Sequence, residues 1–197
     1  MKARKLAIDG AIEFTPTVFP DKRGLFASPL QEPAFSEAVG APFQLARTIH
    51  STSHRGVMRG IHFTTTPPGC AKYIHCARGK ALDFVVDTRV GSPTFGQWDV
   101  VELDEVSVRA VYLAPGLGHA FIAMADDTIM SYLCSAVYVP SEELSVNPLD
   151  PEVGLPVPDG IEPIRSERDT VAPTLAEALA QRLLPDYEFC QRNFPMP

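Results

Sequence analysis

The sequence contains no apolar run long enough to cross a membrane, and its first residues lead into no signal-like apolar stretch. A membrane span needs roughly 18 to 20 consecutive apolar residues, and a secretory signal needs an apolar core behind its basic start. We therefore expect no membrane partner and a cytoplasmic location. Internal repeats and low-complexity linkers are also missing, so we expect one domain over residues 1–197.

Basic residues are too few for a nucleic-acid-binding surface. Lys and Arg number 17 against 24 Asp and Glu, which gives a formal net charge of −7. Proteins that bind nucleic acids carry broad basic fields, so a nucleic-acid partner is not expected. An anionic ligand would need a local cluster of Arg and Lys.

The usual spacings of metal ligands are absent as well. The four cysteines show no Cys-x-x-Cys spacing, and the five histidines show no His-x-His. A metal-dependent oxygenase or isomerase would want clustered His and carboxylate ligands. We therefore expect buried thiols in place of disulfides or zinc ligands, and no metal or other cofactor.

Most of the chain has the residue pattern that is typical of β-strands. Short runs rich in β-branched and aromatic residues lie at 71–76, 81–87 and 110–113. Turn signals separate such runs at a spacing of about 8 to 12 residues, which is typical of an all-β sandwich or barrel. The pattern predicts a jelly-roll (cupin-like) barrel over residues 1–140.

The last part of the chain, residues 141–197, has a different character. Prolines from Pro148 to Pro163 predict loops packed on the outside of the barrel. A short C-terminal helix is expected over 175–184, because Thr174 and Glu177 can form a capping box and Pro185 would end the helix.

Two predicted hairpins place polar side chains. A two-residue turn at 126–127 would set Phe121 opposite Tyr132, with His119 and Tyr132 on one face. A two-residue turn at 78–79 would pair Ala77 with Lys80.

The second hairpin would also set Ile74 opposite Asp83. Lys72 would then lie diagonal to Asp83, about 7 to 8 Å away. This arrangement is compatible with a structural ion pair between the two, and equally with a role for Asp83 in a site.

Several short segments along the chain carry a further signal. In order, they are Phe19–Phe26, Gly56–His62, Ala71–Tyr73, Gly91–Gly96, Gly118–Phe121, Tyr132, Tyr138–Glu143, Asp150-Pro151 and Ser166–Asp169. Together they resemble the dTDP-4-dehydrorhamnose 3,5-epimerase family. A single piece such as Arg-Gly-x-His is weak, whereas the ordered set covers nearly the whole chain.

The resemblance implies an enzyme that epimerises a dTDP-linked 4-keto-6-deoxyhexose at C-3, C-5 or both, in deoxysugar biosynthesis. His62 would be the general base, and Asp169 would hold its imidazole and stabilise the charged form. Tyr132 would be the acid on the other side of the sugar, and Lys72 would lie beside the keto oxygen or the enolate.

The resemblance also implies the binding residues and a homodimer. Arg59, Arg168 and His119 would bind the sugar nucleotide, largely through its phosphates, and Glu143 would be a further contact. The thymine base and diphosphate would be held by residues supplied in part by the partner subunit, namely Phe19, Arg23, Phe26 and Tyr138.

These residue types suit the chemistry. A hydrogen next to a ketone can be removed because the electrons delocalise into an enolate, and inversion requires that a proton return on the opposite face. Histidine suits the base because its ordinary pKa of about 6.5 lies near neutral pH. A phenol can return the proton, and a cation such as Lys72 stabilises the enolate oxygen.

Arg59 and His62 are an odd number of residues apart, so on a regular strand they would point to opposite faces. If both reach one ligand, a bulge or twist is expected at Gly60.

Three positions depart from the family's pattern. Ser28, Arg47 and Ile49 stand where the rhamnose-pathway enzymes usually carry Glu, Gln and Asn as ligand contacts. Because Ile49 cannot hydrogen-bond a hydroxyl, the sequence favours a less hydroxylated sugar, in a branch that makes unusual deoxysugars for a natural product. Inversion of one centre, with C-5 as the candidate, is the corresponding expectation.

Two other functions are compatible with much of this pattern. A 3,4-ketoisomerase on the same fold would also use His and Tyr on a dTDP-4-keto-6-deoxyhexose. A sugar-nucleotide sensor would need the cations but not the combination of His62, Tyr132 and Asp169.

Overall fold

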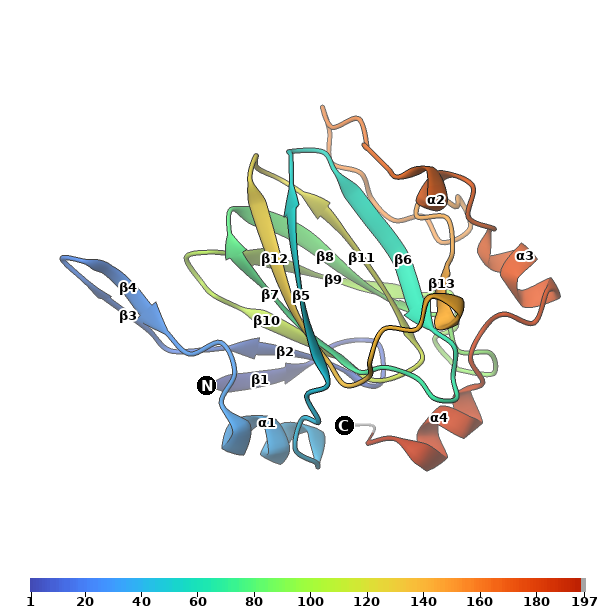
Figure 1. Cartoon of the computed structure of the whole chain (residues 1–197), viewed down its shortest axis with the longest axis horizontal. Helices are drawn as coiled ribbons and strands as arrows, with labels where there is room; N and C mark the ends of the chain where they lie inside the picture. Colours follow the sequence, from blue (N-terminus) through green and yellow to red (C-terminus); the bar gives the residue numbers. More distant parts are fainter. Residues whose placement is uncertain (196–197) are drawn as a thin grey trace.

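A computed structural model of the chain describes residues 1–195. Two antiparallel sheets face each other, and a two-stranded hairpin extends away from them (Figure 1). The six-stranded sheet has the order β1 (Lys2–Lys5), β2 (Ala11–Thr15), β10 (Ala110–Leu113), β7 (Lys72–Arg78), β12 (Thr128–Cys134), β5 (Arg47–Ser53). The five-stranded sheet has the order β13 (Glu143–Ser145), β6 (Met58–Thr64), β11 (Leu117–Ala123), β8 (Lys80–Asp87), β9 (Trp98–Asp104). The hairpin consists of β3 (Val18–Asp21) and β4 (Gly24–Ala27), and the predicted jelly-roll fold is confirmed.

Alternate residues of the facing strands fill the space between the sheets. In β8, Ala81 and Val85 join an inner core with Met130 of β12, while Phe84 and Val86 belong to a second core on the other side of the sheet. This period of two is the normal alternation of strand side chains. Each inward-facing polar residue therefore lies in an otherwise apolar layer.

Helix α1 (Glu32–Val39) covers the outer face of the six-stranded sheet. Phe35 contacts the rings of Phe14, Tyr73 and Tyr112, with centroids 5.7, 5.8 and 5.2 Å apart. The helix lies outside the predicted elements, because eight residues with only two buried positions, Phe35 and Val39, give little helical periodicity.

The C-terminal part covers the outer face of the five-stranded sheet. Val153 and Leu155, from the Pro-rich loops, pack into the second core with Phe84, as the sequence predicts. The 3-10 turn η1 (Pro140–Glu142) precedes β13, and the segment also contains α2 (Glu167–Thr170), α3 (Leu175–Ala180) and α4 (Tyr187–Asn193). Within residues 1–195, no helix is long and apolar enough to cross a membrane.

Helix α3 begins where the sequence predicts and ends earlier. The capping box between Thr174 and Glu177 is present. Arg182 then takes a φ of 58°, and the backbone N–H of Leu183 bonds the carbonyl of Ala178 at 3.0 Å. This left-handed residue directly after the C-cap Gln181 closes the helix after six residues, so the prediction of a helix to residue 184 is wrong at its end.

Neither predicted hairpin forms. Strands β11 and β12 lie in different sheets, and so do β7 and β8. Phe121 is paired with Asp83, and Tyr132 with Ile49 and Ile74. The predicted pairs Phe121–Tyr132 and Ile74–Asp83 are therefore absent.

The pairing of Ala77 with Lys80 is absent for the same reason, since β7 and β8 do not pair. A short turn has the same sequence signature whether the next strand pairs with the last one or crosses to the facing sheet. Long-range pairing decides between the two.

The predicted irregularity at Gly60 is confirmed. His62 pairs with His119 and Arg59 with Phe121, so two residues of β6 lie opposite one residue of β11. Gly60 has a φ of 125°, and a Cβ there would come within 2.5 Å of Ala120. The bulge brings Arg59 and His62 to the same cavity. The four cysteines are buried free thiols, as expected.

The bulge yields a stability prediction. Gly60→Ala should lower the free energy of unfolding by about 1–3 kcal/mol more than Gly91→Ala, because only the first change adds a clash to the strain of a positive φ. Gly91 has a φ of 88°, and a Cβ there would have no atom within 4 Å, so it is the matched control. Urea unfolding would measure both, and equal losses would contradict the crowding at Gly60.

Candidate active site

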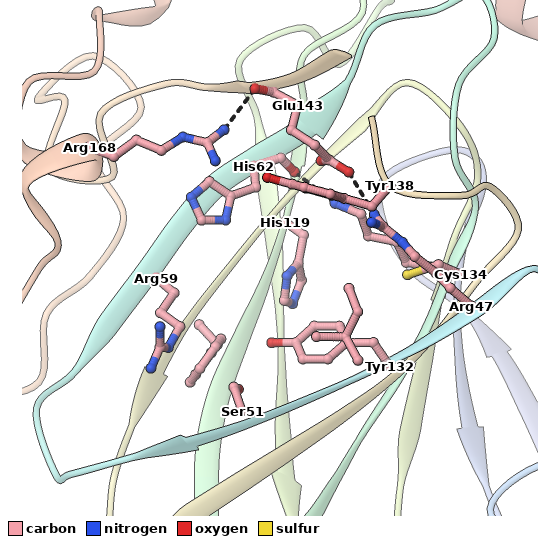
Figure 2. A pocket seen from close by; sticks show the side chains of 13 residues that line it. Arg47, Ser51, Arg59, His62, His119, Tyr132, Cys134, Tyr138, Glu143 and Arg168 are labelled. Carbon is pink, nitrogen blue, oxygen red and sulfur yellow. Dashed lines mark hydrogen bonds and ion pairs between the residues drawn. The ribbon is translucent and has the colours of Figure 1, made fainter. Parts of the chain in front are cut away.

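A cavity of about 250 Å³ opens between the inner faces of the two sheets. Figure 2 shows its side chains converging from strands of both sheets and from the C-terminal segment. The lining residues are Arg47, Ile49, Ser51, Arg59, His62, Lys72, His119, Phe121, Tyr132, Cys134, Tyr138, Glu143 and Arg168. A second cavity, of about 450 Å³ beside α1, is lined mainly by apolar side chains and holds none of the predicted site residues.

His62 is fixed by Asp169, from the first turn of α2. The His62 Nε2 lies 2.7 Å from the Asp169 Oδ1, and the Asp169 backbone N–H donates to the Ser166 hydroxyl at 3.1 Å. Asp169 is buried, whereas the His62 side chain is 30% exposed. Since Asp169 engages Nε2, the neutral imidazole carries its proton there and Nδ1 is its basic nitrogen.

Electrostatics keeps the imidazole neutral. Burial lowers the pKa of His62, the hydrogen bond and charge of Asp169 oppose that change, and the cations Lys72 and Arg168 reinforce it. Burial would raise the pKa of Asp169, but the hydrogen bonds from His62 and Ser166 and the His62 charge outweigh it and lower that pKa. A neutral base beside an ionised carboxylate results.

Lys72 lies on the opposite sheet, on β7, and is buried. Its Nζ donates to the His62 carbonyl at 3.2 Å. An ammonium has three donor hydrogens. Within residues 1–195, Lys72 donates one hydrogen bond, to the His62 carbonyl, so two donors remain for a ligand oxygen. The alternative of an ion pair between Lys72 and Asp83 is wrong, because the Asp83 carboxylate bonds His119 instead.

Tyr132 is also buried, and its ring meets the ring of His119 edge to face, with centroids 5.6 Å apart at 82°. The two residues come from facing sheets, so their contact arises across the barrel and not within a hairpin. Burial raises the pKa of Tyr132 strongly, and the Asp83 charge adds to the effect. The phenol therefore stays protonated at neutral pH.

Four residues linked by hydrogen bonds and ring contacts form one side of the cavity, namely Arg47, Tyr138, Glu143 and Arg168. The Arg47 Nη2 lies 2.6 Å from the Glu143 Oε1, and the Arg47 guanidinium lies 5.0 Å from the Tyr138 ring centroid. The Arg168 Nη2 donates to the Glu143 carbonyl at 2.8 Å (Figure 2). Glu143 is thus bonded through both its carboxylate and its backbone.

Arg59 completes the cationic lining. Its guanidinium donates to the Ser53 hydroxyl and the Thr52 carbonyl, both at 3.3 Å. With Arg47, Arg168 and Lys72 it forms a local cluster of positive charge in a chain of net charge −7. Such a cluster suits a ligand that carries phosphates.

Three lining residues were not predicted as site residues: Ser51, Phe121 and Cys134. Strand alternation would have indicated Ser51, which shares the inner face of β5 with Arg47 and Ile49. Phe121 and Cys134 read as ordinary core residues, and only the arrangement of the two sheets shows that they border a cavity.

Four predicted binding residues do not line the cavity. Phe19, Arg23 and Phe26 lie on the β3–β4 hairpin, where the two phenylalanines are 59% and 70% exposed. Ser28 follows the hairpin and donates to the carbonyl of Leu30 at 2.9 Å. The hairpin leads away from the barrel (Figure 1), so within one chain these residues stay apart from His62.

Comparison with known proteins gives a consistent result. Residues 5–177 match the profile of the family described as dTDP-4-dehydrorhamnose 3,5-epimerase. A dTDP-4-dehydro-6-deoxyglucose 3-epimerase of Streptomyces bikiniensis is 49% identical, over 95% of this chain and 96% of that protein. A dTDP-4-dehydrorhamnose 3,5-epimerase of Mycolicibacterium smegmatis is also 49% identical, over 97% of this chain and 94% of that protein.

Solved structures agree with these relatives. NovW, a 4-keto-6-deoxy sugar epimerase from the novobiocin biosynthetic gene cluster of Streptomyces spheroides, superposes with a TM-score of 0.95 at 49% identity, over 97% of this chain and 96% of that one. ChmJ, a 3'-monoepimerase from Streptomyces bikiniensis solved with dTDP-quinovose, superposes with a TM-score of 0.92 at 49% identity, over 95% and 94% of the two chains.

The electrostatics of His62 can be tested by NMR titration of its imidazole. We expect a midpoint below the ordinary value of about 6.5, because burial and two cations disfavour the charged form. Asp169→Asn should move the midpoint further down, since it removes the carboxylate that favours protonation. A midpoint that rises in Asp169→Asn would contradict this account.

Proposed function

The chain belongs to the dTDP-4-dehydrorhamnose 3,5-epimerase family, and from this membership we propose how its cavity epimerises a dTDP-linked 4-keto-6-deoxyhexose. The observation that carries the proposal is the shared cavity of three groups: a neutral His62 held by Asp169, a protonated Tyr132, and the Lys72 ammonium. They are a base, an acid and an enolate-stabilising cation.

In the proposed first step, His62 Nδ1 takes the hydrogen from the carbon next to the ketone as a proton. The electron pair of that C–H bond forms the C=C bond of an enolate, and the carbonyl electrons move to the oxygen. Lys72 donates a hydrogen bond to that oxygen. Asp169 stabilises the imidazolium that forms, through the 2.7 Å contact to Nε2.

In the second step, the Tyr132 hydroxyl gives its proton to the same carbon from the opposite face. The enolate returns to the ketone with inverted configuration. The phenolate regains a proton and the imidazolium loses one, so the net reaction consumes none. The raised pKa of Tyr132 suits this role, because the phenol is protonated whenever substrate binds.

The proposed mechanism needs no metal ion. Its charge stabilisation comes from Lys72 and the arginines, and within residues 1–195 no group of three or more His, Cys, Asp or Glu could hold a metal.

We propose that the sugar has fewer hydroxyls than the rhamnose precursor, and that one centre is inverted. Ile49 lines the cavity, 38% exposed, and is paired with Tyr132. The Glu143 Oε1 already accepts from Arg47, so fewer acceptor positions of this carboxylate remain for a sugar hydroxyl. This wall therefore offers few partners to a polar substituent. The single-centre relative described above is a 3-epimerase, which favours C-3 over C-5 as the inverted centre.

We also propose a homodimer in which the β3–β4 hairpin of one subunit completes the cavity of the other. Exposed Phe19 and Phe26 would be costly on an isolated surface, and they are suited to stacking on a nucleobase. Arg23 beside them could bind a phosphate. Such mutual exchange of one element is typical of twofold dimers.

The mechanism predicts that exchange and inversion can be separated. In deuterium oxide, NMR would follow C-3 and C-5 of dTDP-4-keto-6-deoxyglucose and its 2,6-dideoxy analogue, with chelator present. His62→Asn should abolish both deuterium incorporation and inversion and leave dTDP affinity nearly unchanged. Tyr132→Phe should still incorporate deuterium with retained configuration, while inversion falls by about 100- to 10,000-fold.

Inversion at the parent rate in Tyr132→Phe would show that the proton comes from another group. A requirement for a divalent ion would contradict the metal-free mechanism. Movement of the keto group from C-4 to C-3 would instead support the ketoisomerase alternative, which the epimerase relatives do not favour.

The shared-site dimer predicts complementation between two inactive variants. One is His62→Asn, and the other is Phe19→Ser/Phe26→Ser in the hairpin. Mixed after subunit exchange, they should regain about a quarter of parent activity, because half the dimers are mixed and one of the two sites in each is intact. No recovery in a mixture shown to contain mixed dimers would contradict the shared site.

A further inference from the structure

Asp83 is a buried carboxylate that the proposed mechanism does not use. It is fully buried on the inner face of β8, between the core residues Ala81 and Val85. Its Oδ2 lies 2.7 Å from the His119 Nε2, and its Oδ1 has no hydrogen-bond partner in the described part of the chain. A buried carboxylate with one oxygen left unbonded is costly to keep.

Asp87, on the same strand, shows what a structural carboxylate looks like in this fold. It is also fully buried, but its oxygens accept hydrogen bonds from Arg89, Ser92 and Thr94. It lies outside the cavity lining. Asp83, in contrast, bonds a histidine that lines the cavity.

Asp83 is connected through His119 to Tyr132, the proposed acid. His119 is bonded on its Nε2 side, and its ring packs edge to face on Tyr132, with centroids 5.6 Å apart. Figure 2 shows His119 between His62 and Tyr132. A general acid must be held within a few tenths of an ångström of its productive position, and the Tyr132 ring depends on its neighbours for that.

We infer that Asp83 is a positioning residue, which fixes the His119 ring so that His119 in turn holds Tyr132 for reprotonation. This inference rests on the proposed role of Tyr132. The cavity therefore contains two His–Asp couples with separate tasks. His62 and Asp169 remove the proton, and His119 and Asp83 support its return. Since His119 pairs with His62 across β6 and β11, the two histidines lie on neighbouring strands.

The test is the ratio of inversion to deuterium exchange in Asp83→Asn. The amide has nearly the same shape as the carboxylate, but it carries no charge and therefore makes a weaker hydrogen bond to His119. The ratio should fall by about 10- to 100-fold, the range found when the carboxylate behind a metal-ligating histidine is lost. A general loss of folding would lower both rates together and leave the ratio unchanged.

Asp87→Asn is the matched control, because it perturbs a carboxylate of equal burial on the same strand, away from the cavity. It should lower thermal stability and leave the ratio at the parent value. The double variant Asp83→Asn/His119→Asn should show no lower ratio than His119→Asn alone, because Asp83 acts through His119.

If Asp83→Asn does not fold, Asp83→Leu/His119→Phe replaces both partners by apolar groups and leaves no unpaired polar atom. Exchange should fall with the loss of His119 as a ligand contact, and inversion should fall further, so the ratio should again be low. An unchanged ratio in a folded variant would overturn the inference about Asp83. Failure of the role of Tyr132 itself would be seen separately, as normal inversion in Tyr132→Phe.

Discussion

Ionisable groups buried between two apolar sheets must find partners, and this requirement organises the centre of the molecule. His62 is bonded to Asp169, His119 to Asp83, and Lys72 to a backbone carbonyl. The two His–Asp contacts join segments far apart in the sequence, and the Lys72 contact joins strands of the two facing sheets. Hydrogen bonds offset the cost of burying these groups, and burial lowers the pKa of His62, which leaves its imidazole neutral and able to accept a proton.

The geometry around these groups comes from two departures from regular sheet structure. The bulge at Gly60 turns Arg59 and His62 toward one cavity, which a regular strand would not do. The short connection after β11 carries the chain to the other sheet, so Tyr132 faces His119 across the interior. A base on one sheet and an acid on the other can then reach opposite faces of one sugar ring.

The arrangement of charge fits the ligand class. The cavity gathers guanidinium groups and one ammonium, although the chain as a whole is acidic. Arg47 is partly neutralised by Glu143 and stacks on Tyr138, which rigidifies one side of the cavity. The exposed aromatic residues of the β3–β4 hairpin lie outside one subunit's cavity, and a second subunit would give them a role.

Local signals in the chain were enough to predict the strand-rich fold, the α3 capping box, the irregularity at Gly60 and the family. Periodicity of two, cap residues and ordered motifs are local properties, so a single chain read in order contains them. The family resemblance also indicated the site residues, and most of them line one cavity.

The pairing of the strands, in contrast, could be known only from the folded protein. Turn residues specify that the chain reverses, but they do not specify whether the next strand joins the same sheet or the facing one. The choice depends on contacts between distant strands. For that reason the expected hairpins were wrong, Asp83 proved to be the partner of His119 and not of Lys72, and Tyr132 met His119 from the opposite sheet.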